Sequence, residues 1–208
     1  MQSNSADWES YAKSTSSAII RAHYFFTVWR NYLFLLHGLK IPQGTLLEIG
    51  SSTGQNSLRL AKKYKLKPTL VDTSRHALIT ANRLFRQSKI VPRLIQQDVL
   101  SLSLNHQFNF VHSHGLLEHL RNSAQRIAFH NHAKYVCPNG WLICWVPTPD
   151  ILYQMNRWYL ERTNQWIFGY EKPLLLKDFI LFFHREDLQI RKICHPPGWL
   201  GIAAQKPV

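Results

Sequence analysis

The chain has 208 residues, of which 45% are hydrophobic and 12% aromatic, so it is long enough to bury a full core and unlike a disordered chain. It carries 25 Lys and Arg against 12 Asp and Glu, a net charge of +13 that raises the question of a nucleic-acid partner. The excess arises from scarce acids, and the densest basic run covers only residues 59–67. Nucleic acid is therefore an alternative partner and not the favoured one.

The cysteines and the apolar segments indicate the compartment. The three cysteines form no CxxC pair, which argues against a disulfide framework and against a zinc knuckle. The first residues are polar, without a basic and then apolar leader. Arginines and histidines interrupt the apolar stretch 18–39. We therefore expect a cytoplasmic protein that has no membrane partner.

Strands and helices are predicted to alternate along most of the chain. An amphipathic helix is expected within 7–39. Strands are expected at 45–50, 67–72, 91–99, 108–115 and 141–147. Helices are expected at 57–65, 74–87 and 123–136; Thr73 or Ser74 caps the second of these, and Pro138 and Gly140 stop the third. Because these strands are nearly continuous in apolar residues, the pattern predicts a parallel sheet covered on both faces. An aromatic segment follows over 148–173, and then a helix at 174–184 and a hairpin of strands at 188–195 and 199–207.

Small residues and acids follow the first three strands. The first strand runs into Glu48, Gly50 and Gly54, a loop that lets the backbone approach a ligand next to a helix N-terminus. A dinucleotide fingerprint is excluded because Ser52 and Gln55 stand where it needs glycine, and no P-loop triplet exists. The next two strands end at acids, and a carboxylate there can accept both hydroxyls of a ribose. The pattern therefore favours a nucleoside ligand at the carboxyl edge of the sheet.

Five motifs in this order carry a family resemblance. LLEIGSSTG, LVDTS, QQDVLSL, FNFVHSHGLLEHL and YVCPNGWLICWVPTP resemble those of the class I S-adenosylmethionine-dependent methyltransferases, in particular the small-molecule "type 11" group, over residues 45–147. The resemblance implies an α/β, Rossmann-like, three-layer αβα fold with a seven-stranded, mainly parallel sheet and an antiparallel last strand. It also implies one domain over 1–208, divided into N-terminal cap helices (1–40), a cofactor-binding core (45–147), a substrate cap (148–173) and a C-terminal helix with a β-hairpin (174–208).

The resemblance implies the cofactor, S-adenosyl-L-methionine, and where its parts lie. Glu48 and Gly50 are expected by the methionine end, Asp72 by the ribose, and Asp98 with Val99 by the adenine. Ser52 departs from the family, which has glycine there. The full set of predicted cofactor-binding residues is Glu48, Gly50, Ser52, Gly54, Asp72, Thr73, Asp98, Val99 and His114.

The residues after the fourth strand are candidates for chemistry. An oxygen acceptor needs its proton removed, and a histidine suits this role, so we predict His114 as the base and His119 as a second catalytic candidate. The pair Glu118 and His119, expected to open a helix, has a structural or cofactor-adjacent role as its alternative. Some relatives use a Glu-x-x-Glu-His pattern as metal ligands, but Gly115 replaces the first glutamate here. Two ligands rarely suffice, and we predict no metal.

The aromatic segment 148–173 is predicted to cover the methyl acceptor. Its candidate substrate residues are Arg157, Trp158, Trp166 and Tyr170, which suit a small, largely apolar or aromatic molecule. The alternative for any single ring is packing of the cap onto the sheet. Oxygen is the first choice of acceptor atom, with nitrogen or carbon close behind. The alternative functions are an RNA or protein methyltransferase that uses the basic surface, and a binding protein without catalysis.

Overall fold

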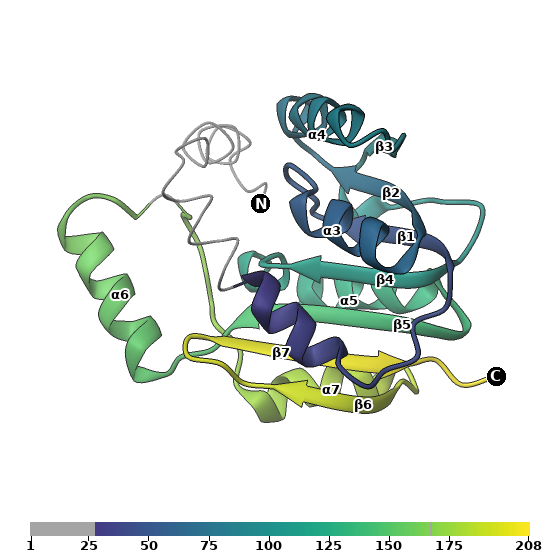
Figure 1. The fold of residues 1–208 in the computed structure, drawn as a ribbon. Coiled ribbons are helices and arrows are strands. Elements are labelled where there is room, and N and C mark those ends of the chain that lie inside the picture. Colours follow the sequence, from purple (N-terminus) through teal and green to yellow (C-terminus); the bar gives the residue numbers. More distant parts are fainter. Residues whose placement is uncertain (1–27, 167) are drawn as a thin grey trace.

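The computed structural model describes residues 28–166 and 168–208, and Figure 1 shows their arrangement. A helical segment at 28–36 precedes the sheet. The strands are β1 (Gly44–Ile49), β2 (Leu66–Asp72), β3 (Arg93–Gln96), β4 (Phe108–His114), β5 (Val136–Pro147), β6 (Gln189–Cys194) and β7 (Trp199–Gln205). The helices are α3 (Gln55–Tyr64), α4 (Arg75–Gln87), α5 (Ser123–Lys134), α6 (Ile151–Arg162) and α7 (Leu176–Arg185), with short 3-10 turns η1 (Val99–Ser101) and η2 (Leu117–His119).

The seven strands form one sheet in the order β3-β2-β1-β4-β5-β7-β6. The strands β1 to β5 pair in parallel, and β7 pairs antiparallel with both β5 and β6. The sheet is therefore mainly parallel with an antiparallel last strand, as predicted. The chain builds outward from β1 to β3 and then returns to place β4 on the other side of β1. This reversal puts a ligand-binding switch point where β1 and β4 end.

Apolar side chains alternate between the two faces of the sheet, and helices cover both (Figure 1). Leu47 packs with α5 and α7, whereas its neighbour Leu46 packs with the 28–36 segment and α3 on the opposite face. Leu70, on the same face as Leu46, packs with α4. This burial on both sides explains why the parallel strands read as continuous apolar runs.

The segment 148–173 contains α6, which stands away from the sheet in Figure 1 and has no buried residue. Asp150 caps its N-terminus by accepting a hydrogen bond from the Tyr153 amide at 2.9 Å. Of the predicted N-terminal cap, 28–36 is helical, and residues 1–27 lie outside the described part of the chain. None of the described helices has both the length and the apolar character that a membrane span requires.

The junction between α5 and β5 differs from the sequence prediction. Helix α5 ends at Lys134, before the expected stop, and β5 begins at Val136, so Pro138 and Gly140 lie within the strand. A register shift between β4 and β5 accommodates them, and Gly140 accepts a hydrogen bond from the Lys206 amide at 2.9 Å. Glu118 and His119 lie in the turn η2 and do not open α5.

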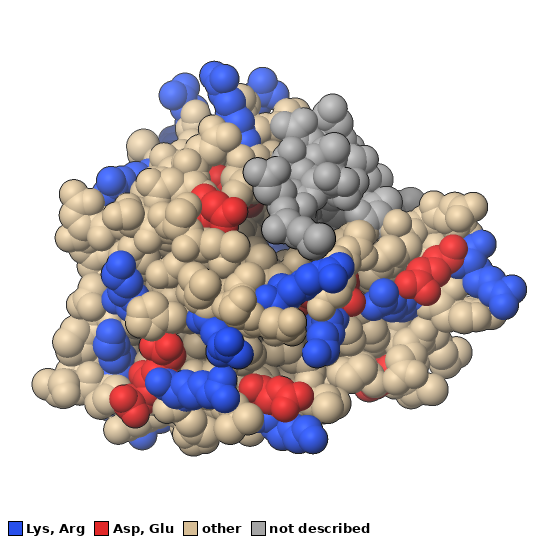
Figure 2. All heavy atoms as spheres, turned by 180° about the vertical axis from the view of Figure 1, so that it is seen from behind, with Lys and Arg blue, Asp and Glu red and all other residues tan. Residues whose placement is uncertain are grey.

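Basic and acidic side chains are interspersed on the surface. Figure 2 shows one face of the molecule, where Lys and Arg are separated by uncharged residues and by Asp and Glu and do not merge into a continuous stripe.

Candidate functional site

The loops after β1 and β4 meet at the carboxyl edge of the sheet. Gly50 has a φ of 69°, and its amide donates to Val71 of the neighbouring strand at 2.9 Å. A Cβ added at Gly50 would lie 2.9 Å from the Leu116 side chain, so the loop after β4 closes against this position. Glycine is therefore required both by the backbone conformation and by the approach of the second loop.

Asp72 is fixed at the end of β2 by two backbone amides. Its carboxylate accepts hydrogen bonds from Ser52 at 2.7 Å and from Ser74 at 2.8 Å. Burial raises the pKa of Asp72, and the amide hydrogen bonds oppose that shift. Ser52 has a φ of 46°, in the left-handed region that glycine tolerates better, so the departure from the family pattern introduces local backbone strain. The Ser52 amide and the Asp72 carboxylate nonetheless lie together at the carboxyl edge of the sheet.

Several buried polar atoms around α3 have no hydrogen-bond partner among the described residues. They include Glu48 Oε2, Ser51 Oγ and Asn56 Oδ1, all in or next to the loop after β1. Gly54 caps α3 without a side-chain hydrogen bond. Because buried polar atoms are normally satisfied, this cluster fits a ligand with several donors, such as the amino and hydroxyl groups of S-adenosylmethionine. The residues present therefore suit the cofactor that the motifs imply.

Behind this loop lies a buried network that the sequence did not reveal. His112, paired with Glu48 in the β1–β4 register, makes ring-nitrogen hydrogen bonds to Tyr32 Oη at 3.1 Å and Ser57 Oγ at 2.9 Å. Burial lowers the pKa of His112 to about 3 and raises that of Glu48 to about 8. Both groups are therefore neutral at pH 7, and their 3.8 Å approach is not an ion pair.

Three more of the predicted cofactor-binding residues, Thr73, Asp98 and Val99, follow the ends of β2 and β3. Thr73 is exposed, and its carbonyl accepts a hydrogen bond from Gln96 Nε2 at 3.0 Å. Asp98 is also exposed and caps η1 through the Leu100 amide at 2.8 Å. Val99 is 7% exposed. The structure thus places all three on the same side of the loop after β1, beyond Asp72.

The predicted base His114 ends β4 among aromatic rings. Its ring centroid lies 4.4 Å from that of Trp199, 6.1 Å from Tyr32 and 6.3 Å from Trp145. Burial lowers the pKa of His114 to about 4, which keeps the imidazole neutral at physiological pH. The end of β4 therefore presents a neutral imidazole in an aromatic setting, one residue before Gly115.

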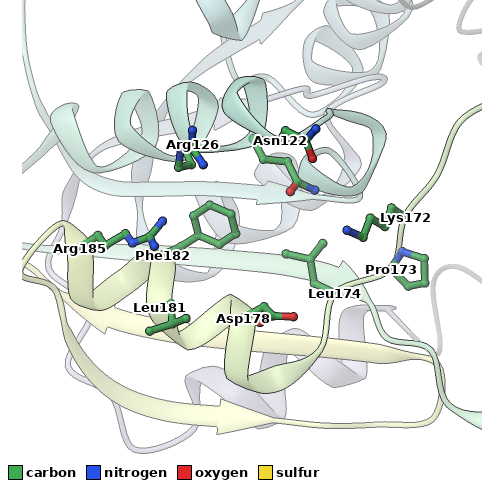
Figure 3. A pocket seen from close by; sticks show the side chains of 10 residues that line it. Asn122, Arg126, Lys172, Pro173, Leu174, Asp178, Leu181, Phe182 and Arg185 are labelled. Carbon is green, nitrogen blue, oxygen red and sulfur yellow. The ribbon is translucent and has the colours of Figure 1, made fainter.

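A cavity of about 230 Å³ lies elsewhere, between α5 and α7 (Figure 3). Arg126, Lys172 and Arg185 line it together with Leu174 and Phe182. None of the predicted cofactor, catalytic or substrate residues lines this cavity. It therefore belongs to the helical layer and not to the site predicted at the carboxyl edge.

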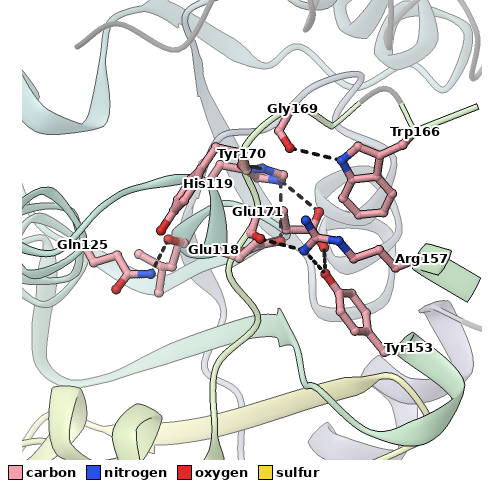
Figure 4. A network of polar contacts seen from close by, with 10 residues as sticks. Glu118, His119, Gln125, Tyr153, Arg157, Trp166, Gly169, Tyr170 and Glu171 are labelled. Carbon is pink, nitrogen blue, oxygen red and sulfur yellow. Dashed lines mark hydrogen bonds and ion pairs between the residues drawn. The ribbon is translucent and has the colours of Figure 1, made fainter. Parts of the chain in front are cut away.

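The second catalytic candidate, His119, faces the segment after α6 (Figure 4). Its Nδ1 lies 3.1 Å from the Tyr170 carbonyl, and its Nε2 lies 3.7 Å from Glu118 Oε1 and 3.8 Å from Glu171 Oε2. Burial lowers the pKa of His119 to about 4 and raises that of Glu118 well above its ordinary value. Glu171, which the sequence analysis did not identify, thus lies beside Glu118 and His119.

The predicted substrate residues separate into two groups. Arg157 and Trp166 lie near Glu171: the Arg157 guanidinium stacks 4.7 Å above the Trp166 ring, and its Nη1 donates to the Glu171 carbonyl at 2.9 Å. Tyr170 packs under Arg121 at 4.0 Å. Trp158 is 59% exposed and contacts Arg162 one turn further along α6. Three candidates therefore surround the Glu171 segment, and Trp158 lies apart from them.

Comparison with known proteins gives the class. Residues 46–140 match the family profile described as a methyltransferase domain. Comparison with curated protein sequences finds no match.

Solved structures share the fold over nearly the whole chain. The N-methyltransferase NodS from Bradyrhizobium japonicum WM9, in complex with S-adenosyl-L-homocysteine, has a TM-score of 0.64 and 19% identity over 93% of this chain and 90% of its own. The magnesium protoporphyrin IX methyltransferase ChlM from Synechocystis PCC 6803, with bound S-adenosylhomocysteine, has a TM-score of 0.72 and 14% identity over 98% and 95%. An S-adenosylmethionine-dependent methyltransferase from Clostridium acetobutylicum ATCC 824 has a TM-score of 0.71 and 14% sequence identity, over 97% of this chain and 99% of its own.

The profile match, the sheet topology and the loop after β1 together define a class I methyltransferase domain. The protein is an S-adenosylmethionine-dependent methyltransferase, and S-adenosylmethionine is its cofactor.

Proposed function

We propose that the protein methylates an oxygen atom of a small, largely apolar or aromatic molecule. The observation that carries this proposal is the position of His114 at the end of β4, among Tyr32, Trp145 and Trp199, next to the loop that closes on Gly50. An acceptor bound here contacts aromatic surface, and its hydroxyl meets a neutral imidazole. Aromatic surroundings with few polar groups are typical of sites for apolar small molecules.

The chemistry follows from this arrangement. The acceptor oxygen attacks the methyl carbon in line, a C–O bond forms, the C–S bond breaks, and S-adenosylhomocysteine leaves. The acceptor's proton passes to His114, which must be neutral to receive it. Burial supplies that neutral form by lowering the pKa of His114 to about 4. Asp72 and the loop after β1 hold the cofactor while the acceptor approaches.

The segment after α6 supports an apolar acceptor. Trp166 and Phe168 stack edge to face at 5.1 Å, and Phe168 lies 6.4 Å from His119. We assign Arg157, Trp166 and Tyr170 to the acceptor side of the site, where aromatic rings exclude water from the reacting centre. Trp158, exposed on α6, is the weakest of the predicted substrate residues because no described contact connects it to this group.

Calorimetric titration of S-adenosylmethionine and S-adenosylhomocysteine tests the cofactor site. We expect Asp72→Ala to lose binding, because the variant removes a carboxylate that two amides hold in place. Asp178→Ala, at the start of α7, is the matched control and should bind as the wild type does. Failure of the wild type to bind either molecule would favour a binding protein without catalysis.

A screen with labelled methyl donor tests the acceptor. We expect transfer to aromatic hydroxyl compounds and its loss in His114→Gln, with folding intact by circular dichroism. Transfer to amines only, or to RNA or protein instead of small molecules, would contradict the proposed acceptor class without affecting the cofactor assignment.

A further inference from the structure

Three ligand atoms from two distant parts of the chain converge beside the turn η2. Glu118, His119 and Glu171 each offer one ligand atom, and these atoms all lie within 4.8 Å of one another. The side chains of the three residues are 2%, 7% and 8% exposed, so this convergence is buried. Figure 4 shows the carboxylates directed at the histidine from η2 and from the segment after α6.

The hydrogen bonds around His119 determine which atom faces the carboxylates. Nδ1 lies 3.1 Å from the Tyr170 carbonyl, which only accepts, so Nδ1 carries the proton. Nε2 is therefore the ring nitrogen that faces Glu118 and Glu171. Its distances to their oxygens, 3.7 and 3.8 Å, are too long for N–H···O hydrogen bonds. The arrangement therefore places Nε2 beside one oxygen of each carboxyl group.

The two carboxyl groups are positioned so that a cation could bind between them. Glu171 Oε1 accepts a hydrogen bond from Tyr153 Oη at 2.7 Å, which leaves Oε2 directed at His119. Glu118 Oε2 is buried and has no hydrogen-bond partner among the described residues. When both carboxyl groups are ionised they repel each other in this low-dielectric environment, and a cation between them and His119 offsets that repulsion.

The geometry points to a binding site for a divalent transition-metal ion, Zn²⁺ or Mn²⁺, held by Glu118, His119 and Glu171. A nitrogen ligand with two carboxylates suits these ions better than Ca²⁺ or Mg²⁺, which prefer oxygen. Ligand atoms on one tetrahedral ion lie about 3.4 Å apart, so a small side-chain adjustment brings the observed 3.7 and 3.8 Å into range. The Tyr170 carbonyl and the Tyr153 hydroxyl orient the ligands, as outer-shell partners do in metal sites.

This site was not predicted from the sequence, because Gly115 stands where a further acidic ligand would be and Glu171 lies 53 positions after Glu118. A bound ion joins the turn after β4 to the segment after α6, which already contact each other through the Lys172 amide and the Glu118 carbonyl at 2.9 Å. Three protein ligands leave coordination positions for water or for another oxygen ligand.

Metal binding itself is the test, and it is independent of the methyl acceptor and of cofactor binding. Full-length protein is freed of metal with a chelator and titrated with Zn²⁺ and with Mn²⁺ in a competition assay with a metal-sensitive indicator. We expect one site per chain, weakened at least about 10-fold in Glu171→Gln and in Glu118→Gln. Co²⁺ substitution should give a visible absorption band in the wild type that both variants lose.

Glu186→Gln is the matched control. Glu186 pairs with the exposed His130 at 3.1 Å. The variant therefore removes a histidine–glutamate contact that is not part of the three-residue cluster. Its metal affinity should equal that of the wild type. The proposal is overturned if the wild type binds no ion, or if all the variants bind as the wild type does, since the surface histidines would then account for binding. If Glu118→Gln does not fold, Glu171→Gln decides the outcome.

Discussion

Burial acts in opposite directions on the ionisable groups at the carboxyl edge of the sheet. It raises the pKa of Glu48 to about 8 and lowers that of His114 to about 4, because in both cases the charged form loses its hydration. Both groups are therefore uncharged at pH 7 in the protein without ligand. A neutral imidazole among aromatic rings suits the approach of an apolar acceptor.

Glu48 gives a pH-dependent stability that can be measured. Its pKa in the folded protein, about 8, exceeds its ordinary 4.5, so its contribution is fully present below pH 4.5 and is lost as the pH rises to 8. Glu48→Gln lacks this loss. We therefore expect the free energy of unfolding of the variant, measured by thermal unfolding, to rise relative to that of the wild type between pH 5 and 8, by at most ~1.4 kcal/mol per pH unit.

Other titrating groups are the same in both proteins and cancel in this comparison. Glu186→Gln, altered at a more exposed glutamate, should run parallel to the wild type over the same range. Parallel curves for Glu48→Gln as well would show that the Glu48 carboxyl is ionised in the folded protein.

At the scale of elements, two side chains of α6, Tyr153 and Arg157, donate hydrogen bonds to Glu171 in the segment that follows the helix. Arg157 donates from Nη1 to the Tyr153 hydroxyl at 3.2 Å and to the Glu171 carbonyl at 2.9 Å, and its Nε donates to Glu161 at 2.8 Å. The helix buries none of its own residues. Polar contacts with Glu171 therefore link α6 to the segment 168–172, whose Tyr170 carbonyl and Lys172 amide in turn contact His119 and Glu118 of η2.

Arg157→Ala is expected to loosen that segment. Loss of its hydrogen bonds, about 1–1.5 kcal/mol, should raise amide exchange over 168–172 roughly tenfold, measured by hydrogen–deuterium exchange with mass spectrometry. Arg162→Ala serves as the control because Arg162 stacks on the exposed Trp158 and not on the segment. Equal protection in the two variants would show that other contacts hold the segment in place.

At the scale of the whole molecule, the net charge of +13 raises the question of a polyanionic partner. The face in Figure 2 carries basic side chains separated by acidic and uncharged ones. Scattered cations bind polyanions weakly, because few phosphates are neutralised at a time. The charge therefore accounts for solubility and for non-specific attraction better than for recognition of RNA.

Filter binding with single-stranded RNA checks this interpretation. We expect weak retention at 50 mM salt that disappears at 200 mM, because the binding is electrostatic and non-specific. Calorimetric affinity for S-adenosylhomocysteine should change little over the same range. Saturable RNA binding that persists at 200 mM would favour the RNA methyltransferase alternative.

The sequence by itself determined the order of strands and helices along the chain, the small-residue loop after β1 and the acid that ends β2. These features depend on local patterns: apolar runs, a glycine-containing turn and an acid at a strand end. Asp98, expected to end the third strand, lies two residues beyond β3 and caps η1. The end of α5 at Lys134 was harder to predict from the sequence. The pairing that extends β5 through Pro138 involves Lys206, far away along the chain.

Only the tertiary structure decided which distant residues meet. Tyr32 reaches His112 across 80 positions, and Glu171 reaches His119 across 52. Trp158, by contrast, lies exposed, although it belongs to the aromatic segment 148–173 that was predicted to cover the substrate. Such contacts depend on how the 28–36 segment and α6 pack on a sheet whose strand order reverses at β4. No short-range pattern encodes that packing, because non-local contacts form from the topology as a whole.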